Sequence, residues 1–94
     1  MQSITMKEFI EKRGNLRVID VRETDEYAAG HVPDALNIPM SEVGNRVAEL
    51  QDGNAIICQS GRRSLQVAGF LDSKGVDVIN IEGGTSAYPY ELEV

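Results

Sequence analysis

The sequence predicts an α/β fold, in which a mainly parallel sheet is flanked by helices on both faces. Segments typical of strands alternate with segments typical of helices, as in parallel sheets with helical crossovers. The segment "AIIC" (Ala55–Cys58) has no polar alternation, as expected of a strand buried on both faces. With 94 residues, 41% of them hydrophobic, the chain is long enough for one core and too short for two. We therefore expect residues 1–94 to form a single domain.

The first half of the chain predicts two helices and two strands. "TMKEFIEKRG" opens with Thr5 and Glu8 in the spacing of a capping box, and its glycine can end the helix. "LRVIDV" (Leu16–Val21) is apolar and β-branched, which favours a strand. "TDEYAAG" has Thr24 as a candidate N-cap and a terminal glycine, and is predicted to be helical. The short apolar segment "ALNI", closed by a proline, predicts a second strand.

The second half continues the alternation. "SEVGNRVAEL" predicts one helix that is capped by Ser41 and has three apolar residues on one face: Val43, Val47 and Leu50. Asp52–Gly53 is a turn signal before "AIIC". "RSLQVAGFLDSKG" (residues 63–75) is the clearest helix, with Val67, Ala68 and Leu71 facing inward. "VDVINI" (residues 76–81) predicts a further strand, and "EGGTSAY" a loop that leads into a last short helix.

The composition restricts the class of protein. The formal net charge is −6, which argues against nucleic acid or an anionic membrane as a partner. No apolar run approaches the ~20 residues that span a bilayer, and no signal-peptide pattern opens the chain, so we expect a cytoplasmic protein. One cysteine cannot form an internal disulfide, and with His31 as the only histidine a structural metal is not expected. We expect no cofactor and a monomeric state.

The single cysteine lies in the stretch "IICQSGRRS", directly followed by a polar loop that contains two arginines. Cys58 ends a predicted parallel strand, which is the edge where α/β sheets bind ligands. Gly61 can adopt positive φ, which would turn successive backbone N–H groups and the next helix N-terminus toward the thiol. Buried cysteines are usually inert, but an inert one would be followed by apolar residues. The loop therefore favours a reactive thiolate with a depressed pKa.

The residues by themselves leave two reactions open. Acyl transfer by a cysteine usually requires a histidine base nearby. His31 lies in "AGHVPDA", which is typical of a connecting turn, so we expect it to bond the backbone there. Phosphoryl transfer and sulfur transfer remain as alternatives.

Three blocks of the chain, taken together and in order, resemble the single-domain rhodaneses. "CQSGRRS" is similar to the active-site loop of that family, in which a cysteine precedes a short loop with glycine, arginine and serine. "VIDVRETDEYAAGHVPDALNIP" resembles its upstream signature, and "INIEGGTSAY" its closing segment, with Tyr88 where many members carry tryptophan. The resemblance covers essentially the whole chain. It implies a five-stranded sheet of order 1-5-4-2-3.

The resemblance also implies a chemistry and a set of site residues. Cys58 matches the residue that takes a sulfane sulfur from a donor such as thiosulfate and passes it, as a persulfide, to cyanide or a thiol. The residues that match the substrate-binding loop are Gln59, Ser60, Gly61, Arg62, Arg63 and Ser64. We expect Arg63 to fix this loop by hydrogen bonds and Arg62 to attract an anionic donor. Asp20 and Arg22 match a supporting Asp-x-Arg signature, in which the carboxylate would bond the backbone or a loop arginine.

Loop length distinguishes the two open reactions. The related dual-specificity phosphatases have five residues between cysteine and arginine, whereas four separate Cys58 from Arg63 here. The shorter ring should suit a sulfur atom better than a phosphoryl group, so we expect a sulfurtransferase. The alternative is a rhodanese module that acts as a persulfide relay or a partner-binding domain without free-standing turnover, possible partners being a thiol, cyanide or a donor protein.

Overall fold

Five short parallel strands form one sheet in the order β1-β5-β4-β2-β3. The computed structural model describes all residues 1–94. The strands are β1 (Gln2–Ile4), β2 (Val18–Asp20), β3 (Leu36–Asn37), β4 (Ala55–Ile57) and β5 (Ile79–Ile81). Every strand pair is parallel. The α/β class, the strand order and the parallel sheet expected from the sequence are therefore confirmed.

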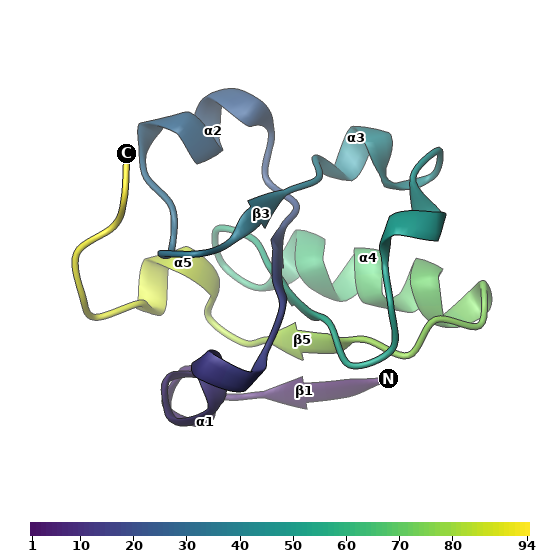
Figure 1. Cartoon of the computed structure of the whole chain (residues 1–94), viewed down its shortest axis with the longest axis horizontal. Coiled ribbons are helices and arrows are strands. Elements are labelled where there is room, and N and C mark those ends of the chain that lie inside the picture. The colour runs from purple at the N-terminus through teal and green to yellow at the C-terminus, as the bar shows by residue number, and fades with distance from the viewer.

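Helices cover both faces of this sheet (Figure 1). They are α1 (Met6–Lys12), α2 (Thr24–Ala29), α3 (Met40–Val43), α4 (Arg62–Ser73) and α5 (Gly84–Ala87), with 3-10 turns at Arg13–Asn15 and Val47–Glu49. Residues of α3 and α4 pack with Ile19 and Ile56 in one core cluster. Residues of α1, and Tyr88 directly after α5, pack with Val18 and Ile57 in a second cluster. Alternate residues of β2 and β4 thus face opposite helical layers, which is why these strands read as continuous apolar runs. No helix is both long and apolar enough to cross a membrane.

The local signals of the sequence were mostly right. Thr5 and Glu8 form the predicted capping box of α1, and Gly30 ends α2. The inward face of α4 is buried as expected at Val67, Ala68 and Leu71. His31 Nδ1 donates a hydrogen bond to the backbone oxygen of Tyr27 at 2.9 Å, which is the structural role expected of it.

Four elements differ from the prediction. The segment "EGGTSAY" was expected to be a loop before the last helix, but α5 (Gly84–Ala87) lies inside it. The residues after Pro39 do not form one helix: α3 ends at Val43, and only a 3-10 turn follows before Leu50. Val43 and Leu50 still lie in the same core cluster, with Val47 packed against it. The three apolar residues therefore face one core, as their spacing predicted, although no continuous helix joins them. The N-cap of α2 is Glu23 rather than Thr24, and its backbone N–H donates to the Glu26 carboxylate. Strand β1 was not anticipated, because its three residues carry no strand pattern of their own.

Candidate active site

Cys58 directly follows β4 at the carboxyl edge of the sheet, and its side chain is fully buried. Its backbone carbonyl accepts two hydrogen bonds from Thr85, one from the backbone N–H at 2.8 Å and one from the hydroxyl at 3.1 Å. The next carbonyl, of Gln59, accepts from the Ser86 N–H at 2.9 Å. The start of α5 therefore holds the backbone on which the thiol is mounted.

Gly61 closes the loop around the sulfur. Its φ of +98° confirms the left-handed conformation expected of it, and its N–H donates to Cys58 Sγ at 3.1 Å. A Cβ at this position would lie 3.1 Å from the backbone nitrogen of Gly83. Both the backbone conformation and the close approach of the two loops therefore require glycine.

The surroundings of Sγ favour the thiolate. Burial alone acts to raise the pKa of the Cys58 thiol, and it is the largest single influence. The hydrogen bonds that a thiolate accepts from the hydroxyl and N–H of Ser64 and from the N–H groups of Gly61 and Ser60 together outweigh it. The net pKa is lowered from its ordinary value, as the sequence predicted.

Asp20 and Arg22 form a buried pair beside the loop. The Asp20 carboxylate accepts from the Arg22 backbone N–H at 2.9 Å and from its guanidinium at 2.9 to 3.2 Å. The guanidinium also donates to the Gly30 carbonyl at 2.7 Å and to Gln59 Oε1 at 3.2 Å. The Asp-x-Arg signature thus acts through the backbone, as expected, but the arginine that Asp20 binds is Arg22 and not one of the loop.

The two loop arginines differ in their partners. Arg63 donates to both carboxylate oxygens of Glu26 on α2, at 2.7 and 2.9 Å. These hydrogen bonds reach α2 and not the loop backbone, and the expectation that Arg63 fixes the loop stays a prediction. Arg62 is exposed and forms no ion pair. It remains the arginine of this loop whose charge no carboxylate neutralises.

Sequence reasoning singled out no residue of α5 and neither Glu26 nor Asn80 as part of the site. The α5 segment was quoted only as a family block, although its paired glycines signalled close backbone approach: a Cβ on Gly84 would overlap the Cys58 carbonyl. Asn80 was visible as the one polar residue in the apolar stretch "VINI". Glu26 carried no signal, because its partner is 37 residues away.

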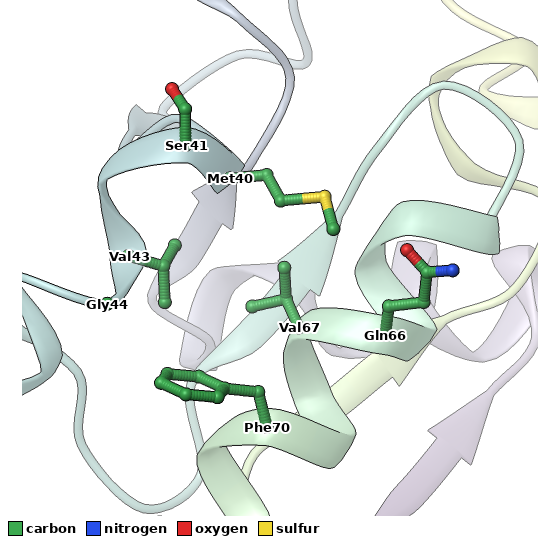
Figure 2. Close-up of a pocket in the computed structure, with 7 residues that line it drawn as sticks. All are labelled: Met40, Ser41, Val43, Gly44, Gln66, Val67 and Phe70. Atoms are coloured by element: carbon green, nitrogen blue, oxygen red, sulfur yellow. The ribbon is translucent and has the colours of Figure 1, made fainter.

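A separate apolar hollow of about 360 Å³ lies between α3 and α4. Figure 2 shows Met40, Val43, Val67 and Phe70 around it. None of its lining residues is charged or carries a thiol, and its one hydroxyl, that of Ser41, donates to the Glu23 carboxylate. We therefore place the candidate active site at Cys58.

Comparisons with known proteins identify the family of this chain. The family model "Rhodanese-like domain" matches residues 5–89. The chain belongs to this rhodanese-like family. It is 37% identical to "Putative sulfurtransferase YtwF" of Bacillus subtilis, across 99% of this chain and 92% of that protein.

Two further relatives extend the comparison. The crystal structure of SSP1007 from Staphylococcus saprophyticus superposes with a TM-score of 0.92 at 36% identity, and each chain is covered completely. "Thiosulfate sulfurtransferase PspE" of Escherichia coli is 36% identical across 70% of this chain and 67% of that protein. The resemblance to single-domain rhodaneses seen in the sequence is confirmed, and the chain is a rhodanese-like sulfurtransferase in class.

Proposed function

We propose that this protein transfers a sulfane sulfur from a small donor such as thiosulfate to cyanide or a thiol through a Cys58 persulfide. The observation that supports this most is the hydrogen-bonded, amide-lined position of Cys58 Sγ. Each stage of such a cycle is anionic: a thiolate, an anionic donor and a persulfide. A backbone N–H that already points at the sulfur, as that of Gly61 does, stabilises all of these without reorganising.

The proposed cycle has two displacements at sulfur. The Cys58 thiolate attacks the outer sulfur of thiosulfate, the S–S bond to the sulfonate breaks, and sulfite leaves with the electron pair. The outer sulfur of the resulting persulfide is then attacked by cyanide or a thiolate. The Cys58–sulfur bond breaks, its electron pair returns to Sγ, and thiocyanate or a new persulfide leaves. No histidine is needed, since the attacking groups are already anions and neither displacement requires a base to remove a proton.

The loop residues take distinct roles in this proposal. Gly61 and Ser64 hold the thiolate with hydrogen bonds, and Ser60 adds a backbone N–H. Arg62 supplies an unpaired positive charge for the donor. Gln59 connects the loop to Arg22, and through it to Asp20, so this pair orients the loop.

Mass spectrometry tests the proposal. The unreduced protein, after incubation with thiosulfate, should gain the mass of one sulfur atom, and cyanide should remove it with the release of thiocyanate. Cys58→Ser should gain nothing while keeping the circular dichroism of the folded protein. An unmodified Cys58 that still reacts with an alkylating reagent would contradict turnover with thiosulfate.

A relay role is the second candidate, and one observation favours it. Two of the three arginines near the loop, Arg22 and Arg63, are already paired with carboxylates. The attraction for a small dianion therefore rests mainly on Arg62, whereas a donor protein would bring its persulfide by docking. A protein that stays unmodified with thiosulfate but gains sulfur from a cysteine desulfurase persulfide would establish the relay. Hydrolysis of an aryl phosphate at a comparable rate would instead contradict sulfur transfer as the main reaction.

A further inference from the structure

Asn80 is a buried amide in a row of the sheet that is apolar on the side of β4 and β2 and polar at Ser3 of β1. It lies in β5, is 3% exposed, and stands opposite Ile56 of β4, which in turn stands opposite Ile19 of β2. Asparagine is disfavoured in strands, and a buried amide must be matched by hydrogen bonds to avoid a desolvation cost. An apolar side chain at this position would avoid that desolvation cost. The presence of an amide therefore indicates that its hydrogen bonds have a specific role.

The side chain of Asn80 links the active-site sulfur to the surface. Cys58 Sγ lies 3.4 Å from Ser64 Oγ, and the Ser64 hydroxyl donates to Asn80 Oδ1 at 2.6 Å. On its other side, Asn80 Nδ2 donates to the hydroxyl of Ser3, an exposed residue of β1, at 3.4 Å. Each group in this chain therefore donates its hydrogen bond to the next one, from the Cys58 thiol through Ser64 and Asn80 to Ser3.

That direction suits the thiol and not the thiolate. Ser64 has a single hydroxyl proton, and while it is given to Asn80 the oxygen can accept from the Cys58 S–H. A thiolate can only accept, so Ser64 must turn its proton toward Sγ. The Ser64 oxygen then needs a donor, and Asn80 can supply one by turning its amide by half a revolution. The Asn80 oxygen would accept in turn from the Ser3 hydroxyl, so every group stays satisfied in both states.

We propose that Asn80 is a positioning residue whose amide reverses its orientation when Cys58 changes between thiol and thiolate, and so directs the Ser64 hydroxyl. Among residues of this size, only an amide offers both a donor and an acceptor in the same plane. The relevance to sulfur transfer rests on the proposed function, because the thiolate is the attacking and the leaving group there. The reversal of the Asn80 amide is tested by titrating Cys58, whereas sulfur transfer is tested by the mass gained from thiosulfate. Failure of one proposal can therefore be told from failure of the other.

Several charged groups also act on Cys58 and must be separated from this effect. The Arg63 guanidinium of α4 interacts electrostatically with Cys58 and with Asp20, the residue that ends β2. Glu26 of α2 pairs with Arg63, and Arg22 pairs with Asp20. On the outer side, Arg62 and Glu82 line a shallow depression with Asn80 and Ser3. None of these groups hydrogen-bonds to Asn80, so a change of its amide orientation is distinct from their charges.

Nuclear magnetic resonance of the unaltered protein gives the direct test. Proton contacts of the Asn80 side-chain NH2 are followed with pH, while ultraviolet absorbance follows the Cys58 thiolate. The NH2 should contact the Ser3 methylene protons below the thiol midpoint and the Ser64 methylene protons above it, and Cys58→Ala should remove the change. An NH2 that contacts Ser3 at every pH would overturn the proposal.

Substitution gives an independent test. Asn80→Asp offers an acceptor alone and adds a charge, so it should raise the Cys58 midpoint by about one unit or more. The same substitution at Asn54, a buried asparagine bound to Arg17 at the opposite end of β4, should leave the midpoint unchanged. In a Ser64→Ala background, Asn80→Asp should shift the midpoint by at most half as much. Equal shifts in both backgrounds would show that only the charge acts, and would refute the role of Asn80 through Ser64.

Discussion

Glu26 and Arg63 are joined by two hydrogen bonds of 2.7 and 2.9 Å that link α2 to α4. The Arg63 guanidinium also interacts electrostatically with Cys58, although its charge is paired with that of Glu26. The hydrogen bonds to the sulfur come from the backbone and Ser64. Glu26 in turn holds the helix that follows β2 against the helix that follows Cys58.

The first prediction concerns the pH dependence of this pair. The hydrogen bond to Arg63 lowers the pKa of Glu26 from 4.5 to about 2. A carboxylate with a depressed folded-state pKa stabilises the protein above its unfolded pKa, and that contribution is lost as the pH falls through the folded value. Glu26→Gln should therefore be less stable than the original protein at pH near 7, and the difference should disappear as the pH approaches about 2.

Urea denaturation across this pH range measures the difference. Glu11→Gln is a matched control, because Glu11 is an exposed helical glutamate without an ion pair. It should change the midpoint little at any pH. A deficit of Glu26→Gln that stays constant down to the acid limit would show that its cause is packing and not the charge.

The second prediction concerns the nucleophile. The alkylation rate of Cys58 against pH should have its midpoint below the free-thiol value of about 8.5. Ser64→Ala should raise that midpoint by about one unit, since Ser64 supplies the strongest of the hydrogen bonds that lower the pKa. Ser73→Ala, at the other end of α4, should leave it unchanged. A midpoint at or above about 8.5 in the original protein would contradict the proposed activation.

The third prediction concerns Gly84. Its φ is +60°, and a Cβ would overlap the Cys58 carbonyl and the Gln59 backbone. Gly84→Ala should therefore destabilise the protein by about 2–4 kcal/mol and slow alkylation of Cys58, because the loop must move. Gly69→Ala is the control: its Cβ would meet no atom, and alanine in the middle of α4 should stabilise by roughly 0.5–1 kcal/mol. Equal denaturation midpoints for the two variants would rule out this account of the loop.

The fourth prediction concerns Arg62. Arg62→Ala should raise the KM for thiosulfate, and the effect should shrink as salt is added, because an exposed charge acts through screened attraction. Arg46→Ala removes one positive charge from a pair of carboxylates elsewhere, Glu42 and Glu49, and should not affect KM. A loss in kcat that does not depend on salt would instead give Arg62 a structural role in the loop.

The sequence was sufficient for the features that depend on neighbours in the chain. The capping box of Thr5, the positive φ of Gly61 and the apolar strand before Cys58 are each specified within a few residues. The approximate course of the site loop follows from these, because a strand end, a glycine and a helix start leave few geometries. The segment after Pro39 is an exception. Ser41 and the spacing of the apolar residues predicted one helix, but Val43 and Leu50 pack into the same core although α3 ends at Val43.

What lies around the sulfur was decided by the tertiary structure. Thr85 reaches the Cys58 carbonyl across 27 residues, and Glu26 reaches Arg63 across 37. Such pairs carry no local pattern, since their partners meet only when parallel strands place their carboxyl ends at one edge. The sequence alone determined that a thiol would sit at that edge with amides and positive charge nearby. Which arginine keeps a free charge, and which amide reaches the thiol through Ser64, depended on contacts that form only after the sheet has brought distant segments together.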